Sequence, residues 1–218
     1  TPLAVDADRR PAVTKRDHLV VMGRVTRYKG QAVAARLAAN TGAPVVLAGP
    51  VGPHHRPEGL TGTDVDEDNP DVRYWREEVE PLVDGRLVRW VGTVAGKERD
   101  DLVATARASL VPIDWEEPGG TAVVESLALG TPVVGFRRGC LPELVEHGRT
   151  GLLVDPGDED ALAAAAAEAA LLSPDDCRRE AARRFTPARM AERYLRLYDR
   201  VLTRSGRPRV HDAVRNGA

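Results

Sequence analysis

Residues 108–154 read ASLVPIDWEEPGGTAVVESLALGTPVVGFRRGCLPELVEHGRTGLLV, and this stretch decides the fold class. It holds three short apolar runs, at 108–113, 132–136 and 151–154. Apolar residues at helical spacing separate these runs, over 122–129 and, more briefly, over 141–146. Short apolar runs that alternate with helices predict strands of a parallel sheet that is buried between two layers of helices.

The same alternation extends to both sides of this stretch. Earlier in the chain, further strands are predicted at 18–23, 44–49 and 86–92, and further helices at 30–40, 72–82 and 97–106. Residues 50–70 form a loop rich in Pro, Gly and Asp, and three more helices are predicted at 159–172, 174–184 and 187–203. We therefore predict an α/β protein: a Rossmann-like three-layer domain over residues 17–203, with a parallel sheet of about six strands and helices on both faces.

The composition excludes several classes of protein. The chain has 218 residues, with 31 basic and 33 acidic side chains and a formal net charge of −2, which argues against a dedicated nucleic-acid binder. Cys140 and Cys177 lie far apart, which excludes a zinc ribbon and a disulfide framework. No apolar run is as long as a membrane span and no signal peptide is recognised, so we expect a cytoplasmic location.

A basic loop follows the first predicted strand. Parallel sheets bind ligands at the carboxyl ends of their strands, where the strand order reverses. The loop GRVTRYKG, residues 23–30, places Arg24, Arg27 and Lys29 at that edge, beside the start of a helix. Cations at a helix N-terminus suit a diphosphate, although a solvated basic loop explains these residues alone equally well. The loop is neither a P-loop nor a GxGxxG dinucleotide motif.

The loop after residues 108–113 carries two acids and two glycines. Glu117 and Glu125 are separated by seven residues, and Gly119 and Gly120 lie between them. Glycines let backbone N–H groups approach a ligand closely, so this turn can hold a phosphate. Each carboxylate can accept hydrogen bonds from vicinal sugar hydroxyls. The alternative is that both acids only favour the helix N-terminus, at about 0.3–1 kcal/mol each. Their occurrence in the same sheet as the basic loop favours a ligand site.

These segments together resemble one enzyme family. GRVTRYKG resembles the GRL-x-x-x-KG segment of the retaining glycosyltransferases with the two-domain GT-B fold, specifically glycosyltransferase family 4. Residues 112–154 resemble the family's signature almost throughout, and residues 185–202 resemble its C-terminal helix. The resemblance implies that this chain is the C-terminal, donor-binding half of an enzyme that transfers a sugar from a nucleotide diphosphate sugar to a hydroxyl, with retention of configuration.

The resemblance also implies a role for each matching residue. Arg24 and Lys29 match the pair that holds the donor diphosphate as it leaves, and Glu117 matches the acid on the transferred sugar, so these three are the candidate catalytic residues. Glu125 matches the acid on the nucleotide ribose. The strand end at 91–94 matches the region that meets the base, largely through its backbone. The candidate donor-binding residues are Gly23, Arg24, Lys29, Val91, Thr93, Glu117, Gly119, Gly120, Thr121 and Glu125.

The implied scheme requires no metal and no cofactor other than the nucleotide-sugar donor. A UDP-sugar is favoured because uridine is common among such enzymes, with a GDP-sugar as the alternative. Gly119 and Gly120 stand where the family commonly has Phe-Gly, which leaves more room beside the donor sugar. Glu116 is an alternative first acid, but it lies one residue too far from Glu125. The neighbouring Arg137 and Arg138 lead us to expect a lowered pKa for the Cys140 thiol.

The resemblance covers one of the two GT-B domains. Ala4-Val5-Asp6 resembles the end of the linker from the N-terminal, acceptor-binding domain, so we interpret residues 1–16 as linker and residues 204–218 as a flexible tail. We expect the N-terminal domain as a partner, encoded in the same gene or in a separate chain, with any membrane association arising through it. We expect this chain alone not to be an efficient enzyme.

Two other functions remain open at this point. The chain can be a stand-alone nucleotide-sugar-binding subunit that a separate chain completes. It can also be a non-catalytic scaffold with the same fold, although the joint presence of Arg24, Lys29, Glu117 and Glu125 argues against a scaffold.

Overall fold

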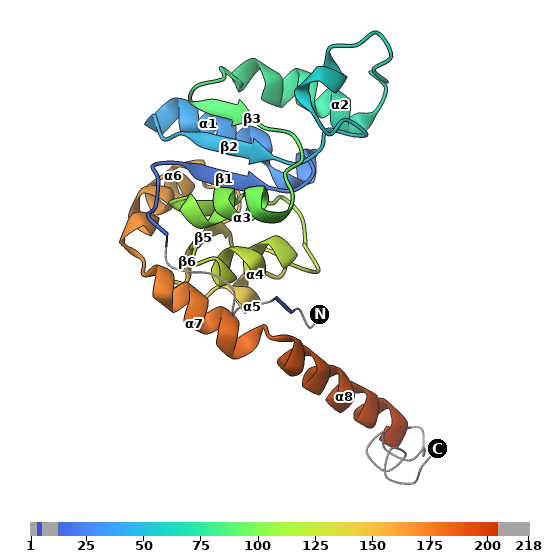
Figure 1. Cartoon of the computed structure of the whole chain (residues 1–218), viewed down its shortest axis with the longest axis vertical. Coiled ribbons are helices and arrows are strands. Elements are labelled where there is room, and N and C mark those ends of the chain that lie inside the picture. Colours follow the sequence, from blue (N-terminus) through green and yellow to red (C-terminus); the bar gives the residue numbers. More distant parts are fainter. Residues whose placement is uncertain (1–3, 6–12, 205–218) are drawn as a thin grey trace.

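The computed structural model describes residues 4–5 and 13–204 (Figure 1). Its centre is one sheet in which every neighbouring pair of strands is parallel. The six strands lie in the order β3-β2-β1-β4-β5-β6. They are β1 (Leu19–Met22), β2 (Val45–Ala48), β3 (Val88–Trp90), β4 (Ala108–Val111), β5 (Val133–Phe136) and β6 (Gly151–Val154). The predicted parallel sheet of about six strands is thereby confirmed.

Helices cover both faces of the sheet, as the sequence predicts. Along β1 the side chains alternate: Leu19 and Val21 belong to the core that also contains α1 and α6, whereas Val20 packs with Val103 of α3 on the other face. The first layer contains α1 (Gln31–Thr41) and α6 (Glu159–Glu168). The second contains α3 (Gly96–Thr105), α4 (Thr121–Ala128), α5 (Leu141–Leu144) and α7 (Pro174–Arg184).

The segment predicted as one helix over 72–82 is a composite. It consists of α2 (Pro70–Tyr74), a π-helical turn η3 (Trp75–Val79) and a 3₁₀ turn η4 (Glu80–Leu82). Pro81 has no backbone N–H to donate, so a regular α-helix cannot continue through it. Trp75 is buried against Trp90 of β3, with ring centroids 4.7 Å apart. The loop before this segment contains a further 3₁₀ turn, η2 (Pro57–Leu60).

The two ends of the chain lie mostly outside the described residues. Within the predicted linker, Lys15 Nζ donates to the Ala104 carbonyl and to Thr131 Oγ1, at 2.8 Å each. At the other end, α8 (Pro187–Arg204) leaves the body of the domain (Figure 1), and none of its residues is buried. Residues 205–218, most of the predicted tail, lie outside the described part of the chain. No helix among residues 4–5 and 13–204 combines the length and the apolar character needed to cross a membrane.

Lys15 and Cys177 give the stability of this domain two opposed pH dependences. Burial lowers the pKa of Lys15 to about 8 and raises the pKa of Cys177 to about 12. Between pH 8 and 10.5 the unfolded chain keeps the lysine proton that the folded chain loses, so this contribution to stability rises with pH. Above pH 9 the unfolded chain loses the thiol proton that folded Cys177 keeps, so the second contribution falls with pH.

We expect these contributions to separate in two variants. Relative to wild type, the free energy of unfolding of Lys15→Met falls more steeply between pH 8 and 10.5, because the rising contribution is lost. The free energy of unfolding of Cys177→Ala falls less steeply, or rises, above pH 9. Urea unfolding at half-unit intervals of pH measures both slopes. Identical slopes in all three proteins would contradict the assignment of these pKa values to burial.

Candidate active site

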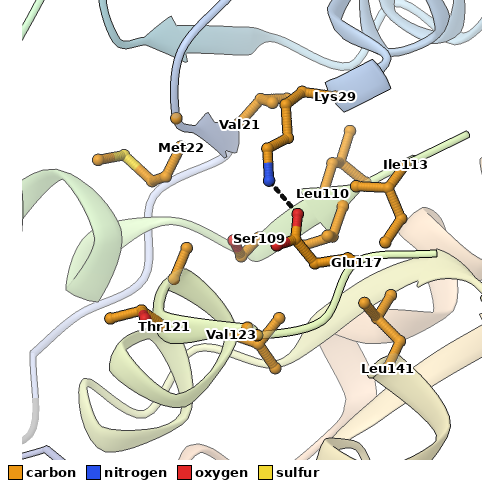
Figure 2. A pocket seen from close by; sticks show the side chains of 15 residues that line it. Val21, Met22, Lys29, Ser109, Leu110, Ile113, Glu117, Thr121, Val123 and Leu141 are labelled. Atoms are coloured by element: carbon orange, nitrogen blue, oxygen red, sulfur yellow. Dashed lines mark hydrogen bonds and ion pairs between the residues drawn. The ribbon is translucent and has the colours of Figure 1, made fainter. Parts of the chain in front are cut away.

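A cavity of about 270 Å³ opens where the strand order of the sheet reverses. β1 and β4 are neighbours there. From β1 the chain continues to β2 on one side of the sheet, and from β4 it continues to β5 on the other side. Such a switch point lies at the carboxyl ends of parallel strands, which is the ligand-binding position of open α/β sheets. The ends of β1 and β4, the loop that follows β4 and the first turn of α4 line the cavity (Figure 2).

An ion pair between Lys29 and Glu117 spans the cavity. Lys29 ends the 3₁₀ turn η1 (Arg27–Lys29), which follows β1, and its Nζ donates to Oε2 of Glu117 in the loop after β4 (Figure 2). The Lys29 side chain is 31% exposed and that of Glu117 is 13% exposed. Trp115 Nε1 donates to the same carboxylate oxygen at 3.2 Å. The predicted diphosphate cation and the predicted sugar acid are therefore side by side, and each compensates the other's charge.

Close backbone packing brings Lys29 and Glu117 together. A Cβ on Gly30, which has φ +71°, would lie 2.1 Å from the carbonyl oxygen of Pro112. Tyr28 and Asp114 add a backbone hydrogen bond of 3.0 Å between the same two loops. Because residue 30 has no side chain, the loop after β1 can pack directly against the loop after β4.

The loop after β5 holds Glu117 from the other side. A Cβ on Gly139, which has φ +56°, would lie 2.4 Å from the backbone nitrogen of Glu117. The Cys140 N–H donates to the Glu117 carbonyl at 2.9 Å. The loops after β1 and β5, which are far apart in the sequence, therefore both pack against the loop that carries Glu117.

Gly119, Gly120 and Thr121 form the part of the cavity wall where α4 begins. Gly120 is the N-cap of α4, and no side chain of the described residues caps this helix end. A Cβ on Gly120 would lie 2.5 Å from Leu144 Cδ1, whereas one on Gly119 would meet no atom within 4 Å. The first N–H groups of a helix have no partner within the helix and carry partial positive charge, so this end of the cavity suits a phosphate.

Arg24 lies beside the cavity and not in its wall. Gly23 lines the cavity, but the Arg24 side chain is 64% exposed and its guanidinium lies 3.8 Å from the carboxylate of Asp71. An ion pair at 3.8 Å whose cation is largely exposed is weak, so little free energy opposes a movement of Arg24 towards a ligand.

The predicted base-contacting residues are engaged through their backbone. The Val91 N–H donates to the Leu47 carbonyl at 3.0 Å, and the Thr93 N–H donates to the His55 carbonyl at 2.8 Å. The Thr93 hydroxyl also lies 2.9 Å from His55 Nδ1. These two N–H groups already have partners, so any backbone recognition of a base by Val91 or Thr93 would use their carbonyl oxygens. Neither residue is among the described residues that line the cavity.

The two alternative acids differ in their surroundings. Glu116 has a side chain that is 81% exposed and accepts a hydrogen bond from the Gly139 N–H at 2.9 Å, whereas Glu117 lines the cavity. This geometry favours Glu117 as the first acid. Glu125 lies one turn beyond the cavity wall on α4, where Arg99 of α3 contacts it at 3.2 Å. Arg99 is not among the residues predicted from the sequence, since no motif or periodicity marks an ion pair between two different helices.

The expectation of a lowered pKa for Cys140 is wrong. Burial, together with the nearby Glu117 carboxylate, raises the pKa of this thiol. The two arginines before it are turned to other partners: Arg137 donates to the Leu153 carbonyl at 3.0 Å, and Arg138 pairs with Asp114. Within the described ranges, no group of three or more His, Cys, Asp or Glu side chains is arranged to hold a metal ion.

Comparison with known proteins now identifies the family. The family model described as "Glycosyl transferases group 1" matches residues 6–186. This chain belongs to the group 1 glycosyl transferases, glycosyltransferase family 4. Its six-stranded sheet and flanking helices match the C-terminal half of GT-B glycosyltransferases.

Three individual proteins show how far the similarity reaches. This group 1 glycosyl transferase is 40% identical over 129 residues to the D-inositol 3-phosphate glycosyltransferase of Corynebacterium efficiens. The aligned region covers 53% of this chain and 30% of that protein. AviGT4, a glycosyltransferase involved in avilamycin A biosynthesis, superposes on this chain with a TM-score of 0.71 and 34% sequence identity. The superposition covers 93% of this chain and 58% of the AviGT4 chain. Anabaena HepE, solved in complex with UDP-glucose, shares the fold with a TM-score of 0.64 and 23% identity, covering 81% of this chain and 47% of its own.

Proposed function

We propose that this group 1 glycosyl transferase binds a nucleotide diphosphate sugar in the cavity between β1 and β4. Lys29 and the first N–H groups of α4 would hold the diphosphate, Glu117 would accept hydrogen bonds from the transferred sugar, and Glu125 would do so from the ribose. The observation that carries this proposal is the Lys29–Glu117 ion pair inside a cavity at the switch point of the sheet. The family membership supports the same roles.

A UDP-sugar is the proposed donor, and a GDP-sugar is the alternative. HepE has been solved with UDP-glucose, and its likeness to this chain concerns the fold. The N–H groups of Val91 and Thr93 are engaged, so base contacts from these two residues would use backbone carbonyl oxygens, which carry no side-chain code for the base. The identity of the base is therefore a matter for a binding measurement.

The proposed chemistry is transfer of the sugar with retention, in the cytoplasm. The acceptor hydroxyl attacks the anomeric carbon on the face from which the diphosphate leaves. Negative charge grows on the diphosphate as that bond breaks. The Lys29 ammonium group and the first N–H groups of α4 would stabilise this charge. The exposed Arg24 can turn away from Asp71 and add a second cation. As the new bond forms, the acceptor hydroxyl gives its proton to an oxygen of the departing diphosphate, so the products are the glycoside and the nucleoside diphosphate.

An acceptor-binding partner completes the proposed enzyme. This chain spans 30% of its Corynebacterium relative and 58% of AviGT4, so the activity of a whole enzyme is a proposal for the chain together with that partner, in the same gene or in a separate chain. A stand-alone nucleotide-sugar-binding subunit would use the same cavity. A non-catalytic scaffold would not bind a nucleotide diphosphate.

Calorimetric titration of the chain with UDP, GDP and ADP tests the proposal. We expect one of them to bind and Glu125→Ala to weaken its binding by about 10-fold or more, because hydrogen bonds to a charged group are lost. Glu159→Ala is the matched control, since Glu159 of α6 also forms an ion pair between two helices, with Arg36. Failure of all three nucleotides to bind would contradict the proposal and favour the scaffold.

A further inference from the structure

A second ion pair lies beside the cavity and connects α3 to α4. Arg99, near the start of α3, directs Nη1 to Oε1 of Glu125 on α4 at 3.2 Å. Both helices begin at the carboxyl edge of the sheet, because each follows a strand of the same parallel sheet. Arg99 therefore lies at the same edge of the sheet as the strand end at 91–94, and it contacts the acid that we assign to the ribose.

The Arg99 guanidinium is itself held in place. Its Nε and Nη2 both donate to Oδ1 of Asp100, at 3.0 and 2.8 Å. The Asp100 side chain is only 7% exposed, whereas those of Arg99 and Glu125 are 35% and 31% exposed. A planar guanidinium that is fixed along one edge by a buried carboxylate has a defined orientation. The nitrogen that remains is the one aimed at Glu125.

This arrangement restricts the Glu125 carboxylate before any ligand arrives. A glutamate side chain that is one-third exposed loses rotamer freedom when it orders around a ligand, and that loss opposes binding. A partner that orders the carboxylate in advance reduces the loss. Arg99 engages Oε1, and each carboxylate oxygen can accept two hydrogen bonds, so both oxygens keep capacity for hydroxyl donors.

We propose that Arg99 is a positioning residue of the nucleotide site, which holds the Glu125 carboxylate in the orientation that accepts hydrogen bonds from the vicinal hydroxyls of the ribose. This inference rests on the proposed function, in which Glu125 contacts the ribose. In this proposal Arg99 acts through Glu125, to which its Nη1 is directed, whereas the diphosphate is assigned to Lys29 and the start of α4. Its effect on binding therefore depends on the ribose hydroxyls, while its contribution to folding stability is small, as for other partly exposed ion pairs.

Binding of UDP and of 2′-deoxy-UDP to the full chain separates these effects. We expect wild type to prefer UDP by about 10-fold or more, since the 2′-hydroxyl donates to a carboxylate. Arg99→Ala should reduce this preference to about 3-fold or less, and Arg99→Lys should restore it in part because the charge returns without the fork. Glu125→Ala should abolish the preference, and the double variant Arg99→Ala/Glu125→Ala should be no worse than Glu125→Ala alone.

The control for a merely structural ion pair is Arg36→Ala. Arg36 of α1 donates two hydrogen bonds to Glu159 of α6, so it also joins two helices through a partly exposed pair. Its removal should leave the preference for UDP at the wild-type value. Thermal melts accompany each titration, and Arg99→Gln replaces Arg99→Ala if the alanine variant does not fold. If GDP is the nucleotide that binds, GDP and 2′-deoxy-GDP take the place of the uridine pair.

Each other outcome overturns the inference in a distinguishable way. If Arg99→Ala weakens both nucleotides by the same factor, Arg99 acts on the diphosphate or on the fold and not through Glu125. If Glu125→Ala binds UDP but keeps the preference, Glu125 does not contact the ribose, and the positioning role falls while a donor site at Lys29 stands. If wild type binds no nucleotide diphosphate, the proposed function and the inference fail together.

Discussion

Lys29→Ala weakens UDP binding by about 10–100-fold, whereas Glu117→Gln tightens it. The opposite signs follow from the ion pair that Lys29 and Glu117 form in the cavity. A diphosphate must draw Lys29 away from Glu117, so the loss of the carboxylate charge removes a competitor for the cation. Loss of the lysine removes the charge-assisted hydrogen bonds themselves.

Binding of the sugar distinguishes the role of Glu117 from that of Lys29. We expect Glu117→Gln to bind UDP-glucose less tightly relative to UDP than wild type does, because a neutral amide accepts hydrogen bonds from hydroxyls more weakly than a carboxylate. In an enzyme form that transfers the sugar, Lys29→Ala lowers kcat by about 10²–10³-fold, the cost of removing one preorganised donor from a developing negative charge.

Calorimetric titration with UDP and with UDP-glucose measures these effects. Lys97→Ala is the matched control, because Lys97 also pairs with a carboxylate, that of Asp101, but lies exposed on α3 away from the cavity wall. Its affinity for UDP should equal that of wild type. A Glu117→Gln variant that loses UDP binding as Lys29→Ala does would show that Glu117 supports the nucleotide and does not compete with it.

The fold was predictable because burial leaves a strong local pattern. A strand covered on both faces is mostly apolar, so the runs that became β1, β2, β4 and β5 stand out from the helices between them. The composite of α2, η3 and η4 was not predictable in this way, because its helical spacing of apolar residues hides the change of hydrogen-bond pattern before Pro81.

The site was predictable only where its residues are close in sequence or match a motif. The E-x7-E spacing and the two glycines identify the start of α4 and the cavity acid Glu117. Arg99 was not predictable because its partner Glu125 is 26 residues away on another helix, and only the folded arrangement of α3 and α4 brings them together. The exposure of Arg24 and the engaged N–H of Thr93 likewise depend on neighbouring loops that no local pattern specifies.

Gly30→Ala destabilises the domain more than Gly42→Ala and also removes nucleotide binding. These glycines flank the two ends of α1 with nearly equal φ values, +71° and +73°. An alanine in this left-handed conformation costs about 1–2 kcal/mol at either position. A Cβ on Gly42 meets nothing within 4 Å, but one on Gly30 would lie 2.1 Å from the Pro112 carbonyl oxygen.

The difference between these two variants isolates the contact between the loops after β1 and β4. The backbone must move to relieve the clash at Gly30, which adds about 1–3 kcal/mol to the loss of stability. Lys29 is the adjacent residue, so the same movement takes its ammonium group away from the cavity. Urea unfolding and UDP titration of both variants measure the two effects. Equal losses of stability with unchanged UDP affinity in both variants would mean that this close approach does not position Lys29, and that the ion pair with Glu117 orders the loop by itself.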